Sequence, residues 1–302
     1  MSEQLTRRTA FLLFAVVVFA WGTTWPVMKA IVADAPPLWA CAIRSATAGI
    51  ALLGLHLARG DLALPPRGDL PVVAGIALLH MVAFAALVAI GIQFIPAGRS
   101  VVLGYTTPLW VVPGARLFLG EPITPWRATG VGIGLTGLAL MFNPLAFDWS
   151  DGNAVLGNGL ILLGAFFWAV SILQVRAHRW ISTPFQLVFW EVLLATVVLA
   201  VLAPLFEGPP TIDWSLQLAL LLLYAAVFGI AVAYWAMATV NRSLPAVTTS
   251  LGVLATPVVG TLCSTVALNE SLDLPLLGAM ALIIAGIAVG TIGRASPAGR
   301  RA

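Results

Sequence analysis

The sequence predicts an all-α membrane protein of ten transmembrane helices, arranged as two inverted repeats of five helices each. Composition, the spacing of apolar runs and an internal repeat predict this fold. Of the 302 residues, 60% are hydrophobic and 9% are charged, and the mean hydropathy is +1.01. A soluble domain carries about 25% charged residues. The composition therefore excludes a soluble enzyme, a disordered chain and a nucleic-acid binder.

Ten apolar runs are long enough to cross a bilayer core of about 30 Å, which needs roughly 20 helical residues. The short connections between them make neighbouring helices antiparallel. The first run follows Arg7 and Arg8 like a signal peptide, but it continues through Trp21 and Pro26 without a small-residue cleavage site. We therefore expect it to be retained as a helix. The ten runs are 10–33, 37–58, 70–93, 96–119, 124–143, 154–178, 183–204, 214–241, 245–267 and 272–294.

Basic residues predict the orientation, because cytoplasmic loops of membrane proteins carry an excess of Lys and Arg. With the N-terminus in the cytoplasm, all but three of the 15 Lys and Arg residues fall on that side. The exceptions are Lys29, Arg44 and Arg99. We expect a multi-pass protein of the inner (plasma) membrane with both termini cytoplasmic. The cytoplasmic set is Arg7, Arg8, Arg59, Arg67, Arg116, Arg127, Arg176, Arg179, Arg242, Arg294, Arg300 and Arg301.

An internal repeat relates the two halves of the chain. Thr107-Pro108 recurs as Thr256-Pro257, 149 residues later. Because each unit holds an odd number of helices, the second copy enters the membrane from the opposite side, as in secondary transporters. We expect the first repeat over residues 1–146 and the second over 147–302. A separation of 149 also pairs Pro96-Ala97 with Pro245-Ala246 and Glu121 with Glu270, and one of 147 pairs Pro37 with Pro184 and Lys29 with Arg176.

Several short motifs keep a fixed order along the chain. In the first half these are Trp21-Gly22, Arg44, Pro96-Ala97, Thr107-Pro108 and Leu119-Gly120-Glu121-Pro122, and in the second half Trp168-Ala169, Pro245-Ala246, Thr256-Pro257 and Leu268-Asn269-Glu270.

Together, these motifs resemble the EamA-type branch of the drug/metabolite transporter superfamily over essentially the whole chain. Within that branch, the chain is most similar to the bacterial aromatic amino-acid exporters. The resemblance implies ten helices in two inverted repeats, cytoplasmic termini and export of small metabolites, often amino acids. Arg99 departs from the pattern, because the family usually has a small residue there.

Arg44 is the first candidate for a substrate contact. It lies seven residues after Pro37, about 10 Å along its helix. An ionisable group at this depth is costly, so it usually has a function. Arg44 is a candidate to hold a substrate carboxylate. Snorkelling to the interface, or pairing with Asp34, is the structural alternative.

Two further charged residues lie within predicted spans. Glu191 lies at the equivalent depth from the other side, and pairing with Arg176 or Arg179 is its expected structural role. Lys29 lies about one turn from a loop, so we expect it to snorkel.

Aromatic residues deep in the spans predict a binding cavity, because an indole N–H or a phenol there needs a partner or a wet cavity. His80 lies near the midplane, where it is either a proton relay or a packing residue with a hydrogen bond. Sparse polar groups between aromatic rings suit an amphipathic solute. Packing against other helices is the alternative for each ring. The predicted substrate-binding set is Trp21, Thr24, Trp25, Arg44, His80, Tyr105, Trp168, Ser171, Tyr234 and Trp235.

Prolines within spans remove a backbone hydrogen bond and can bend a helix. Pro26, Pro108 and Pro257 are therefore predicted to act in gating, with static kinks as the alternative. The stripes Gly130-x-x-x-Gly134 and Gly286-x-x-x-Gly290 predict close helix approach, within the protein rather than between copies.

The leading functional hypothesis is a secondary exporter of amino acids or similar metabolites that works by alternating access. A broad drug or nucleotide-sugar carrier is the alternative in the same superfamily, and an intramembrane enzyme using His80 and Glu191 is the alternative of another class. No enzyme motif or ATP-binding module is present in the sequence. Cys41 and Cys263 give no metal-binding spacing, and no cofactor is expected. The expected partners are a small-molecule substrate and the bilayer, with the protein a monomer or weak homodimer.

Overall fold

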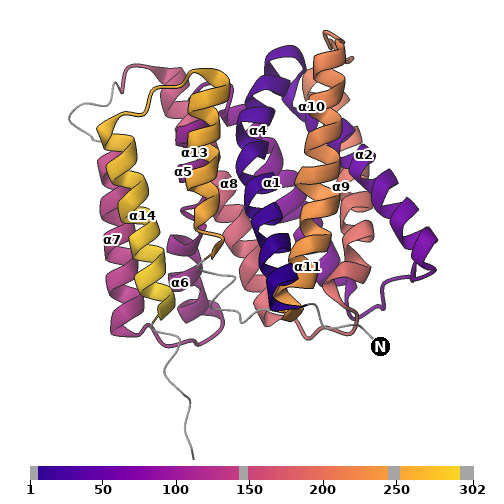
Figure 1. Cartoon of the computed structure of the whole chain (residues 1–302), viewed down its shortest axis with the longest axis horizontal. Helices are drawn as coiled ribbons and strands as arrows, with labels where there is room; N and C mark the ends of the chain where they lie inside the picture. The colour runs from indigo at the N-terminus through magenta and orange to yellow at the C-terminus, as the bar shows by residue number, and fades with distance from the viewer. Residues whose placement is uncertain (1–5, 143–148, 244–251, 293–302) are drawn as a thin grey trace, which may run out of the picture.

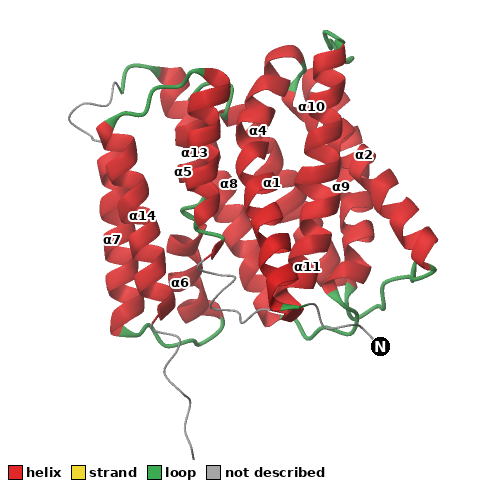
Figure 2. Ribbon diagram, viewed as in Figure 1, coloured by secondary structure: helices red, strands yellow, loops and turns green. Residues whose placement is uncertain are grey.

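The structure is a computed structural model that describes residues 6–142, 149–243 and 252–292. Within these ranges every regular element is helical, and no strand is drawn in Figure 2. The helices stand side by side as a bundle whose two ends carry the connecting loops (Figure 1). We call the end where the first helix begins, at the bottom of Figure 1, the N-terminal face, and the other end the opposite face.

The described helices follow the ten predicted spans, which confirms the fold class. Among the described residues, six helical spans are long and apolar enough to cross a membrane, and two more are shorter apolar helices. The first half of the chain contains α1 (Arg7–Asp34), α2 (Pro37–Arg59), α3 (Leu70–Gly75), the π-helix η1 (Ile76–Phe84), α4 (Ala85–Gly91), α5 (Ala97–Gly104), α6 (Thr107–Phe118) and α7 (Pro125–Phe142).

The second half repeats this order. The predicted boundary between residues 146 and 147, and the Pro245-Ala246 motif, lie outside the described residues. The elements are α8 (Gly152–Ala177), α9 (Pro184–Glu207), α10 (Leu216–Ala226), the π-helix η2 (Val227–Val232), α11 (Ala233–Ser243), α13 (Ala255–Leu268) and α14 (Leu274–Ile292).

Local sequence explains where several helices begin. The Asp151 carboxylate caps α8 by accepting the backbone N–H groups of Asn153 and Ala154, at 3.1 and 3.0 Å. Thr183 and Gln186 form a capping box at the start of α9, and Pro184 stands in its first turn. These residues satisfy amide groups that a helix start leaves unpaired.

The fourth span is broken rather than continuous. α5 ends at Gly104, Tyr105 and Thr106 form a turn, and α6 begins at Thr107. Pro108 therefore stands in the first turn of a helix, where its missing N–H costs nothing. In the second half, α13 likewise begins just before Thr256-Pro257. The symmetric Thr-Pro pairs thus mark helix starts at equivalent places in the two halves.

Pro26 and Pro257 lie at different kinds of position. Pro26 lies inside α1, and Pro257 lies in the first turn of α13; both are buried. A gating role for Pro26, Pro108 or Pro257 stays a prediction.

The two glycine stripes pack against each other within the chain. α7 and α14 lie side by side at one edge of the bundle (Figure 1). A Cβ atom added at Gly130 would lie 2.4 Å from the backbone oxygen of Gly286, and one added at Gly286 would lie 2.5 Å from that of Gly130. Backbone atoms cannot yield as a flexible side chain does, so larger residues are excluded from this contact.

Large apolar side chains cover the outside of the bundle. Ile50 of α2 is 73% exposed, Phe19 of α1 57% and Leu220 of α10 56%. Isolated apolar residues are common on soluble proteins, but long helices exposing so many of them suit a lipid environment. The chain is a multi-pass membrane protein.

Candidate functional site

A cavity of about 460 Å³ lies among α1, α2, η1, α8, α9 and η2. It reaches the N-terminal face, where Trp180 and Pro184 line it, both at or beside the start of α9. Most of its lining is apolar, with a few polar and charged groups, which is the usual character of a small-molecule site.

Nearly all of the predicted substrate-binding residues line this cavity. The exception is Trp235, which the structure places outside the lining, in the apolar packing that includes Val240 and Ala226. The position of Trp235 along its predicted span indicates its depth in the membrane. It does not indicate which face of the helix carries the side chain. The cavity-lining members are Trp21, Thr24, Trp25, Arg44, His80, Tyr105, Trp168, Ser171 and Tyr234.

The aromatic side chains form one connected cluster on the cavity wall. The His80 ring is stacked on Trp168, with centroids 5.1 Å apart and planes at 4°. Tyr105 meets Trp168 edge-on at 5.8 Å, and Trp21 meets Tyr234 edge-on at 6.2 Å. The Tyr234 hydroxyl lies 3.3 Å from Nδ1 of His80. This cluster offers flat faces to a solute ring.

Unusual backbone brings some of these side chains to the cavity. His80 lies in the π-helix η1, and η2 occupies the equivalent place 149 residues later. Inserted π turns are frequent at functional sites because they change which side chains a helix points inward. At the broken fourth span, a Cβ on Gly104 would lie 2.5 Å from the Trp25 ring, so only glycine leaves room for that indole.

Arg44 and Glu191 both line the cavity, and neither forms the ion pair considered from the sequence. No ion pair joins Arg44 to Asp34 or Glu191 to Arg176 in the described part of the chain. The side chain of Glu191 is 3% exposed. Nε of Arg44 is buried and has no hydrogen-bond partner among the described residues. Both side chains are therefore available to a solute in the cavity.

Lys29 forms hydrogen bonds with backbone carbonyls at the opposite face instead of extending freely to the membrane interface. Its Nζ donates to the carbonyl oxygens of Ile92, Gln93 and Ile95, at 2.6, 3.1 and 3.0 Å. These carbonyls lie just beyond the end of α4 and before α5, where helix carbonyls lack intrahelical partners. A cation there ties α1 to the connection between these two helices.

Glu270 makes a second contact at this face, which sequence reasoning missed. Its carboxylate oxygens accept the backbone N–H groups of Ala97 and Gly98, at 2.6 and 2.8 Å, at the start of α5. A carboxylate at a helix start satisfies free amides and complements the helix dipole.

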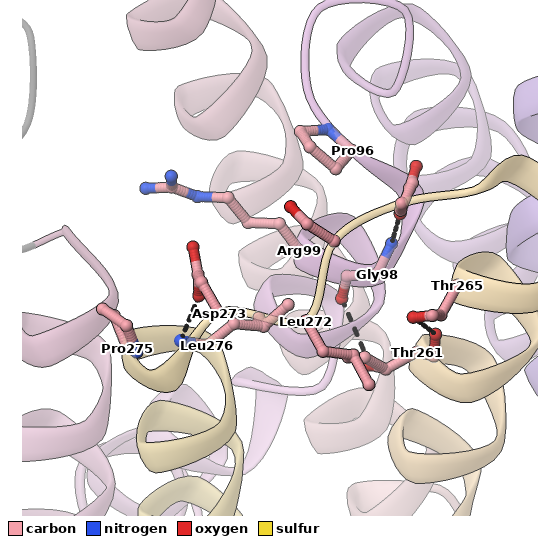
Figure 3. A pocket seen from close by; sticks show the side chains of 11 residues that line it. Pro96, Gly98, Arg99, Thr261, Thr265, Leu272, Asp273, Pro275 and Leu276 are labelled. Carbon is pink, nitrogen blue, oxygen red and sulfur yellow. Dashed lines mark hydrogen bonds between the residues drawn. The ribbon is translucent and has the colours of Figure 1, made fainter.

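Beside this contact lies a small pocket of about 110 Å³ between the start of α5 and the connection from α13 to α14 (Figure 3). In that connection, Asp273 accepts the backbone N–H of Leu276 at 2.7 Å (Figure 3).

Glu207 is a third residue that sequence reasoning missed. Its carboxylate accepts the backbone N–H groups of Leu38 and Trp39, at 2.9 and 3.1 Å, at the start of α2. Glu207 is the last residue of α9, and its place at a helix end beside a loop does not identify the partner in the sequence.

The N-terminal face carries ion pairs of another kind. Glu121 pairs with Arg127 at 3.2 Å and also contacts Arg176. Nearby, buried Asp69 lies 2.8 Å from Nε2 of His178 and accepts the backbone N–H of Ser182 at 2.8 Å. Burial alone would raise the pKa of Asp69, but these hydrogen bonds lower it to about 2. Contacts on this face thus join loops while the cavity between them stays accessible.

Two helical repeats around a central cavity that is reached from one face define a multi-pass membrane transporter. The chain belongs to the EamA-like transporter family, which it matches twice, over residues 8–143 and 155–291. The family model therefore matches once in each half of the chain.

Curated relatives agree with this assignment. The chain is 31% identical over 290 residues to the uncharacterized inner membrane transporter YedA of Escherichia coli (strain K12), covering 93% of this chain and 90% of the relative. It is 27% identical over 285 residues to the uncharacterized transporter YvbV of Bacillus subtilis (strain 168), covering 94% and 92%. Over 110 residues, or 36% of the chain, it is 32% identical to a riboflavin transporter of Rhizobium johnstonii. A solved crystal structure shares the fold, with a TM-score of 0.67 at 23% identity over 95% of this chain and 98% of that one.

Proposed function

We propose that this protein is a secondary transporter that exports amino acids, aromatic ones among them, or similar small metabolites by alternating access. The observation that carries the proposal is the cavity in which an aromatic cluster and Arg44 face the same space. Aromatic faces suit a ring, and a guanidinium suits a carboxylate. Membership of a transporter family speaks against the intramembrane enzyme.

The proposed location is the inner membrane, and the proposed orientation places the N-terminal face in the cytoplasm. The distribution of basic residues supports it. In this orientation the cavity is accessible from the cytoplasm, and Lys29 and Glu270 close the outer side. An exporter loads its substrate in such a state. The substrate gradient is the proposed driving force, with proton coupling through His80 as the alternative, and the proposed state of assembly is a monomer or weak homodimer.

Counterflow in proteoliposomes tests the function. Vesicles loaded with unlabelled L-phenylalanine should accumulate labelled L-phenylalanine without any ion gradient. Trp168→Ala should lower the initial rate about tenfold, because it removes the ring that contacts both His80 and Tyr105. Trp214→Ala, at an exposed tryptophan outside the cavity, is the matched control and should retain the wild-type rate. Wild-type vesicles that accumulate no amino acid would contradict the proposal.

A flat heterocycle is the second candidate substrate. The relative that is named a riboflavin transporter favours it, as does the parallel stack of His80 on Trp168, beside which a planar ring can lie. The same vesicles distinguish the candidates when labelled riboflavin replaces labelled phenylalanine. Accumulation of riboflavin alone would favour this candidate over amino acids.

A further inference from the structure

Arg44 and Glu191 occupy equivalent places in the two repeats but carry opposite charges. Each lies seven residues after the proline in the first turn of its helix, and the two positions are 147 residues apart. Both line the same cavity. The inverted repeat thus sets a basic and an acidic side chain in one space from two symmetry-related helices.

Contacts between α2 and α9 hold these two residues near each other. The Ser45 hydroxyl donates to the Val192 carbonyl at 3.4 Å and accepts from the Thr196 hydroxyl at 2.9 Å. Arg44 directly precedes Ser45, and Glu191 directly precedes Val192. Both charged side chains therefore leave their helices within about one helical turn, or about 5.4 Å, of the same seam.

No ion pair between Arg44 and Glu191 occurs in the described structure. Glu191 forms no ion pair or hydrogen bond among the described residues, although it is almost fully buried. Charges taken out of water are costly unless a partner of opposite sign is supplied. A solute that carries both charges supplies a partner to each residue at once.

We propose that Glu191 is a specificity-determining residue, which with Arg44 forms a two-charge subsite for solutes bearing an ammonium group and a carboxylate. The inference rests on the proposed function and deepens it. Arg44 receives the carboxylate, as a guanidinium does with planar oxyanions, and Glu191 accepts hydrogen bonds from the ammonium. A solute with only one of these groups leaves a buried charge without a partner and is rejected.

The aromatic cluster adjoins this subsite and fixes where the rest of the solute lies. Tyr234 lines the same cavity as Arg44 and Glu191, and its hydroxyl lies 3.3 Å from Nδ1 of His80. His80 in turn stacks on Trp168. An aromatic side chain of a solute held by the two charges can therefore extend along this wall.

Competition against counterflow of labelled L-phenylalanine tests the proposal. The unlabelled competitors are L-phenylalanine, 3-phenylpropionate, which lacks the ammonium group, and 2-phenylethylamine, which lacks the carboxylate. In wild-type vesicles, half-inhibition by either single-charge analogue should need at least about tenfold more compound than L-phenylalanine. Glu191→Gln should remove the preference over 3-phenylpropionate, and Arg44→Gln the preference over 2-phenylethylamine.

Two controls separate charge recognition from damage to the fold. Glu191→Asp keeps the carboxylate and should keep the preference, and Glu207→Gln removes a carboxylate from the same helix outside the cavity and should also keep it. Thermal-shift binding of the three compounds to each purified variant gives the same ratios where transport is slow. Transport of L-phenylalanine with an unchanged preference in Glu191→Gln would overturn this inference alone. Absence of both transport and binding of L-phenylalanine in the wild type would overturn this inference and contradict amino-acid export.

Discussion

Glu270 and Glu121 occupy equivalent positions in the two repeats, yet their carboxylates have different partners. Glu270, at the opposite face, accepts two backbone N–H groups at the start of α5. Glu121, at the N-terminal face, contacts the side chains of Arg127 and Arg176. A helix start is a rigid partner, whereas arginine side chains are long and flexible.

The difference explains how two similar repeats produce one accessible face. At the opposite face, Glu270 and Lys29 both bind backbone atoms and tie whole helices together. At the N-terminal face Glu121 binds arginine side chains and Asp69 binds the loop before α9 rather than the first amides of a helix, and the cavity reaches Trp180. Symmetry in sequence therefore coexists with asymmetry in conformation, as alternating access requires.

Removing the Glu270 carboxylate should have the largest effect on the difference in accessibility between the two faces. Glu270→Ala deletes two hydrogen bonds to a charged group, each worth about 1.5–3 kcal/mol. We expect the population open at the opposite face to rise at least about tenfold and counterflow to slow accordingly. Accessibility of a cavity cysteine from that face measures the shift. Ser271→Ala, at an exposed residue of the same connection that forms no hydrogen bond among the described residues, is the control and should change little.

Acid should lower the stability of the protein by protonating Asp69, whose carboxylate accepts hydrogen bonds at the N-terminal face. Because its folded-state pKa of about 2 lies below the usual value of about 3.9, its contribution to stability is complete above about pH 4. That contribution is lost as the pH falls towards 2. We expect the thermal midpoint of the solubilised protein to fall over this range, and to fall less steeply in Asp69→Asn. Asp151→Asn should keep the wild-type slope, and an equal slope in Asp69→Asn would contradict the assignment.

Removing the Glu121 carboxylate should have the smallest effect. Partly exposed ion pairs contribute about 0–1 kcal/mol, so Glu121→Ala should change the counterflow rate by no more than about fivefold. The test compares the counterflow rates of Glu121→Ala and Glu270→Ala in vesicles of equal protein content. A loss as large as that of Glu270→Ala would show that both faces are closed by contacts of similar strength.

The sequence predicts the helices well because apolar run length and repeat spacing are properties of single segments. It also predicts most of the aromatic residues on the cavity wall, because an indole or phenol deep in a span needs a partner or a cavity, although Trp235 packs against other helices instead. It does not predict the partners of Glu207 and Glu270, because both bind backbone amides, which every residue except proline carries. The face occupied by Trp235 depends on local helix rotation, which η2 changes just before it.

Reactivity of a single cysteine in the cavity, measured from each side of the membrane, tests the one-face access most directly. Ser171→Cys, in a background lacking Cys41 and Cys263, places a thiol on the cavity lining. Asp151→Cys, at the start of α8 on the opposite face, reports the orientation of each vesicle preparation. An impermeant thiol reagent should label residue 171 from the N-terminal face and residue 151 from the opposite face. Labelling of residue 171 only from the same side as residue 151, or equally from both sides, would contradict a cavity open to the N-terminal face alone.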